Sequence, residues 1–134
     1  MESEGLRVVR RGIEAWNDQD LDALIGLLAP DIVWHTAGVL PDLDATYEGH
    51  EGVRHFFSQV VEPWRSIQVD VERVIDEREG QILLGIRFRA EGREGLKVDM
   101  PYFHVYRFDD GLQLTELRAF ADEAEARREA GLNG

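Results

Sequence analysis

The chain has 134 residues, 43% of them hydrophobic and 31% charged, a balance typical of a soluble globular protein. This length favours one domain over residues 1–134. The formal net charge is −12, which opposes binding to nucleic acid and to anionic membrane surfaces. There is no cysteine, so disulfides, thiolate metal sites and cysteine nucleophiles are excluded. No stretch reaches the about 20 apolar residues of a membrane helix, and the N-terminus lacks a signal-peptide pattern, so we expect a cytoplasmic protein.

The first half of the chain is predicted to be mostly helical. Apolar residues from Leu6 to Trp16 recur every three or four positions, which is typical of one helix face. Asp20 is a good N-cap for a second helix, and Pro30 is expected to close it. The remaining predictions are a short strand over residues 31–36, a loop over 37–48, and a helix from about 49 to 64 with a proline near its end.

The second half changes from helical to strand periodicity. Apolar and polar residues alternate from Ile67 to Val71, and the pattern resumes out of phase at Val74, which indicates a bulge. Further strands are predicted over residues 81–91, 98–108 and 112–121, the last two joined by a hairpin turn at residues 110–111. A second bulge is expected near Glu116, and a final helix is predicted from an N-cap at Asp122 to residue 131.

This order of elements predicts an α+β fold. Consecutive long strands joined by tight turns form an antiparallel meander, and the helices that precede them must cover one face. Bulged, curved strands would let the sheet wrap into a half-open cone closed by helices. We therefore expect an internal pocket.

The strand over residues 98–108 carries the main candidate catalytic residue. Val98, Met100, Tyr102, His104, Tyr106 and Phe108 share its apolar face. A histidine among apolar neighbours is either a general acid/base or oxyanion partner, or a buried residue held by hydrogen bonds to a tyrosine or a carbonyl. The sequence leaves both interpretations of His104 open.

Three stretches together resemble the SnoaL-like group of the nuclear transport factor 2-like superfamily. They are RRGIEAWNDQDLDALIGLLAPDIVWH (10–35), YEGHEGVRHFF (47–57), and HVYRFDDG with the later LRAFADEAEA (104–126). The resemblance implies a cone-shaped α+β barrel, commonly a homodimer, with an apolar cavity and no cofactor. Members include ketosteroid isomerases, limonene epoxide hydrolases and polyketide cyclases, so the fold alone does not choose an activity.

The known active sites of the family are not matched. In the resemblance, the carboxylate base of the ketosteroid isomerases falls on Thr36, and their tyrosine donor falls on Gly12. Their second donor, a protonated aspartate, falls on His104. The Asp–Arg–Asp group of the epoxide hydrolases also has no counterpart, and Asp99 lies on the opposite strand face from His104.

Besides His104 as catalytic residue, the predicted site contains seven ligand-binding residues. Arg87 is ambiguous, because the alternation favours its neighbours as core whereas the resemblance places Arg87 toward the cavity. No metal site is expected, since His50 and His55 would point apart on a helix. The ligand-binding residues are Trp34, Thr36, Tyr47, Phe57, Arg87, Met100 and Tyr102.

The sequence is compatible with two functions. The first is binding of a small apolar molecule by a homodimer that performs cofactor-independent acid/base chemistry, such as isomerisation, cyclisation or hydrolysis. The second is a non-catalytic ligand-binding or dimerisation module. The absence of a carboxylate at the expected base position favours the second, and the Tyr–His–Tyr face of the strand favours the first.

Overall fold

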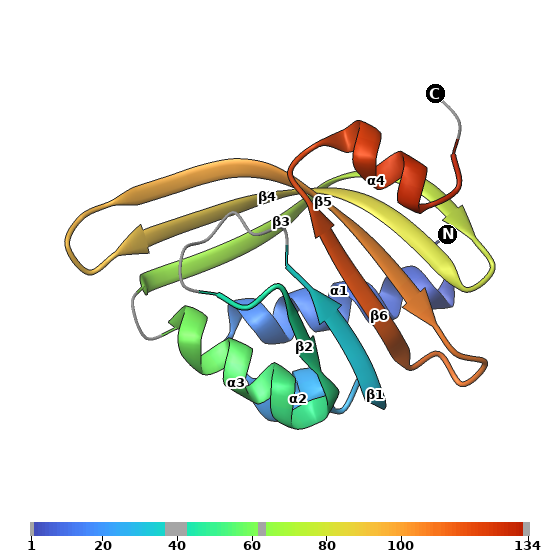
Figure 1. The fold of residues 1–134 in the computed structure, drawn as a ribbon, viewed down its shortest axis with the longest axis horizontal. Helices are drawn as coiled ribbons and strands as arrows, with labels where there is room; N and C mark the ends of the chain where they lie inside the picture. Colours follow the sequence, from blue (N-terminus) through green and yellow to red (C-terminus); the bar gives the residue numbers. More distant parts are fainter. Residues whose placement is uncertain (1, 37–42, 62–63, 133–134) are drawn as a thin grey trace.

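The computed structural model describes residues 2–36, 43–61 and 64–132, and shows a curved sheet with helices on both faces (Figure 1). None of the helices in these ranges is long and apolar enough to span a membrane. The elements are α1 (Glu4–Asn17), α2 (Leu21–Ile25), β1 (Leu28–His35), β2 (Thr46–Glu48), α3 (Gly49–Val61), β3 (Trp64–Arg78), β4 (Gln81–Gly92), β5 (Lys97–Phe108), β6 (Leu114–Phe120) and α4 (Glu123–Glu129).

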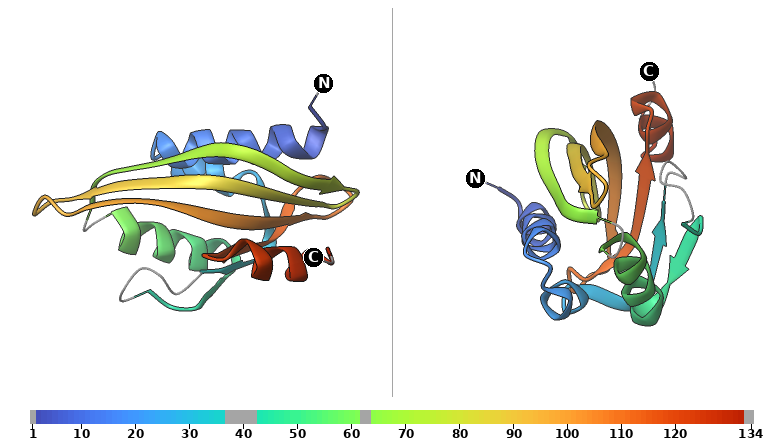
Figure 2. Two further views of the ribbon diagram at one scale, coloured as in Figure 1. Left: turned by 90° about the horizontal axis from the view of Figure 1, so that it is seen from above. Right: turned by 90° about the vertical axis from the view of Figure 1, so that its left-hand side faces the viewer.

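The sheet has six strands in the order β2-β1-β6-β5-β4-β3. All neighbours pair antiparallel except β1 and β6, which are parallel. The end-on view in Figure 2 shows the sheet bent around α1, α2 and α3, with α4 on its other side. The fold is therefore the predicted α+β architecture: a mostly antiparallel, curved sheet wrapped around the N-terminal helices and left open between its two edge strands.

Bulges account for part of the curvature. The pairing register between β3 and β4 shifts between Val71 and Arg73, which leaves Glu72 as an extra residue. A second shift, between β5 and β6, leaves Thr115 as the extra residue. Both bulges were predicted from slips in the apolar alternation, the second one residue away at Glu116. Because a bulge increases local twist, these shifts let the strands wrap.

Several predicted boundaries are wrong. The second helix ends at Ile25, and Pro30 lies inside β1 rather than after a helix. The register between β1 and β6 is irregular between Leu28 and Val33, so Pro30 sits where no regular ladder hydrogen bond is needed. The predicted loop contains β2, which pairs with β1. The third helix ends at Val61, and Trp64 belongs to β3; residues 37–42 and 62–63 of these predictions lie outside the described part of the chain.

The hairpin between β5 and β6 is confirmed, but its turn is longer than predicted. Asp109 organises it, because its Oδ1 accepts hydrogen bonds from the backbone nitrogens of Gly111 (2.9 Å) and Gln113 (3.0 Å). The left-handed position is occupied by Leu112, with φ of 63°. An aspartate side chain that mimics a backbone turn thus replaces the expected two-residue connection.

The core forms on both sides of the sheet. On the concave side, apolar residues of β3 to β6 pack against α1, α2 and α3. On the convex side, Ala126 and Ala130 at α4 pack against Leu83, Phe103 and Val105. The α4 helix begins as predicted, with the Asp122 side chain accepting a hydrogen bond from Ala124 N at 3.0 Å.

Candidate functional site

A cavity lies between the concave face of the sheet and the N-terminal helices. Its volume is about 120 Å³, well above the roughly 10–15 Å³ that one water molecule needs. Nearly all of the lining is aliphatic or aromatic. The lining residues are Val9, Gly12, Ile13, Trp16, Leu24, Leu28, Trp34, Thr36, Leu43, Phe56, Val69, Ile86, Phe88, Tyr102, His104, Tyr106, Leu114, Leu117 and Ala119.

No charged side chain is among the described residues that line this cavity. The polar groups are neutral and few. The Thr36 hydroxyl donates to the backbone oxygen of Asp44 (2.9 Å), and the Tyr102 hydroxyl makes a weak contact with Sδ of Met100 (3.6 Å). Because an unpaired charge is costly to bury in such surroundings, the cavity suits a neutral occupant.

His104 and Tyr106 form the strongest polar pair of the lining. They are two residues apart on β5, so both point to the concave side, and Nδ1 of His104 lies 2.8 Å from the Tyr106 hydroxyl. Burial lowers the pKa of His104 to about 4 and raises the pKa of Tyr106. At neutral pH the imidazole is therefore uncharged and the phenol keeps its proton.

An aromatic wall closes the cavity on the helix side. Trp16 of α1 stacks on Phe56 of α3 with ring centroids 5.7 Å apart, and Trp34 of β1 lies 5.4 Å from Phe56. The indole nitrogen of Trp16 is buried without a hydrogen-bond partner in the described part of the chain. Trp16 and Phe56 both line the cavity.

Comparison with known proteins defines the family. The profile of the SnoaL-like domain matches residues 9–116. The chain belongs to the SnoaL-like domain family. No curated protein matches this SnoaL-like chain.

Solved structures with the nuclear transport factor 2-like fold match this SnoaL-like protein over most of its length. One is a protein of unknown function from Burkholderia pseudomallei K96243, with 26% identity, a TM-score of 0.79, and coverage of 95% of this chain and 97% of that one. A second is a Mycobacterium tuberculosis protein in complex with estradiol-17β-hemisuccinate, with 18% identity, a TM-score of 0.79, and coverage of 90% and 95%. A third is a Δ5-3-ketosteroid isomerase from Mycobacterium sp., with 20% identity, a TM-score of 0.77, and coverage of 92% and 96%. The last two share the fold with this chain.

Four of the eight predicted site residues come together at the cavity: Trp34, Thr36, Tyr102 and His104. Gly12, where the resemblance placed the isomerase tyrosine, also lines it. Each of the four lies on β1 or β5 or directly follows β1. Side chains alternate between the two faces of a strand, so residues two positions apart, such as Tyr102 and His104, reach the same cavity.

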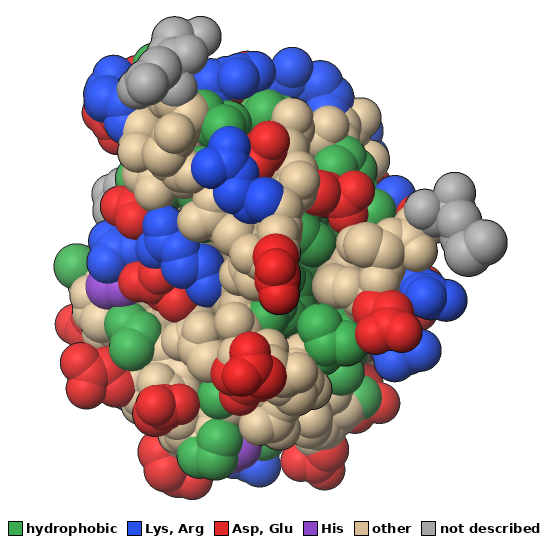
Figure 3. Space-filling view, turned by 90° about the vertical axis from the view of Figure 1, so that its right-hand side faces the viewer, with side chains coloured by type: hydrophobic (Ala, Val, Ile, Leu, Met, Phe, Trp, Pro, Cys, Tyr) green, Lys and Arg blue, Asp and Glu red, His purple; other side chains and the backbone are tan. Residues whose placement is uncertain are grey.

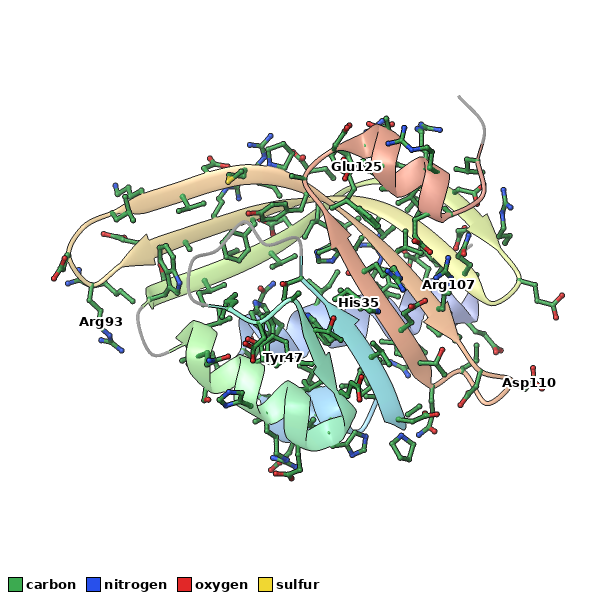
Figure 4. All side chains as sticks on the ribbon, viewed as in Figure 1. His35, Tyr47, Arg93, Arg107, Asp110 and Glu125 are labelled. Atoms are coloured by element: carbon green, nitrogen blue, oxygen red, sulfur yellow. The ribbon has the colours of Figure 1, made fainter. Side chains whose placement is uncertain are left out.

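The other four predicted residues lie outside the lining. Tyr47 of β2 is buried against α3, where its hydroxyl donates to Oε1 of Gln59 (2.5 Å) and accepts from Asp44 N (2.9 Å) (Figure 4). Phe57 makes an edge-to-face contact with Trp16, with ring centroids 5.5 Å apart, and is not among the lining residues. Met100 packs against the core beside Tyr102.

Arg87 belongs to the convex side of the sheet. Its guanidinium binds two carboxylates there, Asp99 at 3.0 Å and Glu72 at 3.2 Å. The alternation, which assigned its neighbours to the core, therefore describes β4 correctly, and the cavity position implied by the resemblance does not hold for this side chain. Asp99 shares this outer face and is no substitute base for the cavity.

The outer surface carries the charges that the cavity lacks. His35 of β1 is not among the lining residues and lies 3.4 Å from Glu116, which also pairs with Arg107 and Arg118. Figure 3 shows one such face, with acidic and basic side chains interspersed. These ion pairs are partly exposed to solvent, so each is expected to contribute little to the stability of the fold.

Tyr106 is a polar lining residue that the predicted site omits. The strand pattern placed it on the same face as His104, yet Tyr106 was not assigned to the pocket. A histidine and a tyrosine at positions i and i+2 of one strand lie on the same face at hydrogen-bonding reach, and this spacing was the available signal. The sequence pattern of β4 and β6 predicts buried apolar residues, but it does not distinguish those that line a cavity from those that pack in the core.

Proposed function

We propose that this protein binds a small, neutral, largely apolar molecule in the cavity, with His104 as its main polar anchor. One observation carries the proposal: a cavity of about 120 Å³ whose described lining has no charge and very few polar atoms. Apolar walls supply affinity, and a few fixed polar groups supply orientation. Trp34, Thr36 and Tyr102 are the proposed ligand contacts.

The structural relatives support an apolar ring system as the ligand. The protein from Mycobacterium tuberculosis was solved in complex with estradiol-17β-hemisuccinate, an apolar steroid whose hemisuccinate arm ends in a carboxylate, and the isomerase from Mycobacterium sp. is a ketosteroid isomerase. Both have the same fold at low identity. Flat, mostly hydrocarbon ligands with an oxygen substituent also suit an aromatic wall facing a histidine.

A matched pair of probes tests the proposal by titration calorimetry at pH 7. We expect 2-acetylnaphthalene to bind, and 2-naphthoate, which carries a charge on the same ring system, to bind at least tenfold more weakly because its carboxylate finds no cation in the lining. The variant Ala119→Leu, which fills the cavity, should weaken binding of the neutral probe. Ala121→Leu changes an exposed alanine outside the cavity and should not. Equal affinity for the two probes, or an unchanged affinity in Ala119→Leu, would refute the proposal.

Cofactor-independent isomerisation or cyclisation is the second candidate, and one observation favours it. The His104 imidazole is bound by Tyr106 at one nitrogen and unbound by described residues at the other. A neutral imidazole with a lowered pKa can stabilise a developing enolate as a hydrogen-bond donor, but it is too weak a base to remove the carbon-bound proton at neutral pH, so that proton would pass to solvent water or hydroxide. Exchange of the methyl protons of 2-acetylnaphthalene in D2O, followed by NMR, tests this activity. Exchange no faster than in the His104→Gln variant would exclude it.

We further propose that the chain is a cytoplasmic homodimer, as the family resemblance suggests. Light scattering coupled to size-exclusion chromatography tests the assembly, because the monomer mass is 15.3 kDa. A mass near twice that value supports a dimer, and the monomer mass at micromolar concentration contradicts it.

A further inference from the structure

We infer that Tyr106 fixes the tautomer of His104, so that Nε2 carries the proton and the site selects ligands that present an oxygen acceptor. Tyr106 is then a positioning residue: it acts on the ligand through the histidine. The part of the inference that concerns the ligand rests on the proposed function. The part that concerns the tautomer rests on the geometry of His104 and Tyr106 alone.

The Tyr106 hydroxyl has one acceptor within reach. Its only hydrogen bond in the described part of the chain is the 2.8 Å contact with Nδ1 of His104. The tyrosine is 4% exposed, so water outside the protein does not reach most of it. A buried hydroxyl must place its hydrogen on an acceptor, and an imidazole nitrogen accepts only when it is unprotonated. Nδ1 is therefore the acceptor, and the ring proton sits on Nε2.

The opposite tautomer leaves more groups without partners. If Nδ1 carried the proton and donated to the tyrosine, the hydroxyl hydrogen would need a second acceptor, and Nε2 would need a donor. Neither partner exists among the described residues. With the proton on Nε2, only one group, the Nε2–H donor, is left unpaired. Buried polar groups cost free energy when unpaired, so the arrangement with one such group is favoured.

That remaining donor is accessible from the cavity. Trp16 Nε1 is the one buried, unpartnered side-chain nitrogen or oxygen in the described ranges, so His104 Nε2, which is also unpartnered there, keeps accessible surface. His104 lines the cavity and points to the concave side. The ligand atom at this point must therefore accept a hydrogen bond, as a ketone, ether or enolate oxygen does; an ammonium group or an amide N–H is rejected there.

The tautomer is measured directly by NMR on protein labelled with ¹⁵N in histidine. At pH 7 we expect the His104 proton on Nε2 and a hydrogen-bonded, unprotonated Nδ1. In Tyr106→Phe the Nδ1 resonance should move to the value of a free ring nitrogen, an Nδ1-protonated population should appear, and the His104 pKa should rise because a bond to the neutral form is lost. Tyr102→Phe is the matched control on the same strand, since its hydroxyl contacts Met100 and not His104, and both ring nitrogens should keep their wild-type resonances.

The ligand preference is measured with 2-acetylnaphthalene and 2-ethylnaphthalene, which have similar shape and differ in the ketone oxygen. Wild-type protein should bind the ketone about two- to tenfold more tightly, the range expected for one added neutral hydrogen bond. His104→Phe should remove this preference, and Tyr106→Phe should reduce it. Binding of the hydrocarbon should change less in both variants.

The outcomes separate the two proposals. A proton on Nδ1 in the wild type, or ring nitrogens unaffected by Tyr106→Phe, overturns the tautomer assignment whether or not any probe binds. Equal binding of ketone and hydrocarbon overturns the acceptor preference and the role of His104 as polar anchor, while binding of a neutral, apolar molecule in the cavity stands. If neither probe binds, the proposed function and the acceptor preference both fall, and an Nε2-protonated ring still supports the role of Tyr106.

Discussion

Lowering the pH from 7 to 5 should destabilise the folded protein through His104. Burial holds the pKa of this imidazole at about 4, against 6.5 for the free side chain. In this interval the unfolded chain takes up a proton at His104 and the folded chain does not. Stability therefore falls as the pH drops below about 6.5 and stops falling, for this group, near pH 4.

The size of the effect follows from the two pKa values. One pKa unit corresponds to about 1.4 kcal/mol, and only the part of the titration between pH 7 and 5 contributes. The expected loss of unfolding free energy is about 2 kcal/mol. Carboxylates affect stability at lower pH. Burial by itself would raise the pKa of Glu116, but hydrogen bonds from Arg107 and Arg118 lower it overall. The stability that Glu116 contributes is therefore lost only as the pH falls below the ordinary range of glutamate.

Urea denaturation at pH 7 and pH 5 measures this loss. For the wild type, about 2 kcal/mol corresponds to a midpoint shift of roughly 1 M. The variant His104→Gln keeps a polar side chain and cannot titrate, so its midpoint should shift much less. A wild-type shift equal to that of His104→Gln would show that the imidazole does not titrate as a buried group, and would remove the basis for treating it as a neutral donor.

Three further substitutions are expected to act differently from one another. Gly12→Ala should stabilise the protein by about 0.5–1 kcal/mol in urea denaturation, because Gly12 lies in α1 and an added Cβ meets only two leucine methyls at 3.8 Å; a loss of stability would contradict this. Asn17→Ala should lower the free energy of unfolding by about 1–3 kcal/mol in the same assay. Asn17 donates to Val69 O (2.9 Å) and accepts from Val69 N (2.8 Å), so it joins α1 to β3. An unchanged midpoint would show that these two hydrogen bonds do not stabilise the fold. Arg87→Ala should leave the affinity for 2-acetylnaphthalene unchanged in calorimetry, because Arg87 pairs with carboxylates on the convex side. Weaker binding by this variant would indicate that Arg87 contributes to the ligand site.

The strand pattern of the second half predicted most of the architecture. Period-two alternation assigned the inward residues of β5, including Tyr102 and His104, because one face of each strand must be buried. Slips in the same alternation indicated the two bulges. A bulge adds one residue to a strand and shifts the alternation of apolar and polar residues. This shift is visible in the local sequence, so the bulges could be predicted without the structure.

Features set by tertiary contacts were beyond the sequence. Pro30 predicts a helix end, yet it lies within β1. Proline has no backbone N–H to donate, and the irregular pairing of β1 with β6 does not require a hydrogen bond at this position. β2 is three residues long and forms only through its pairing with β1. The turn after β5 follows the Asp109 side chain rather than the Asp110–Gly111 dipeptide, since its two hydrogen bonds move the left-handed position to Leu112.

The two-residue alternation also limits the chemistry of the site. On β4 and β5, residues such as Arg87 and Asp99 face outward and pair with each other, while Phe88, Tyr102 and His104 face inward. Charges are thereby sorted to the convex side, where partial exposure keeps them hydrated, and the lining from the same strands stays neutral. His104 is the one lining residue, among those described, whose free side chain titrates near physiological pH, and burial moves its pKa away from that range. A lone, neutral imidazole with a tyrosine on one nitrogen is equipped to hold an oxygen atom in place. Proton abstraction from carbon requires a stronger base than the described lining provides, and this is why ligand binding is the function that the cavity supports best.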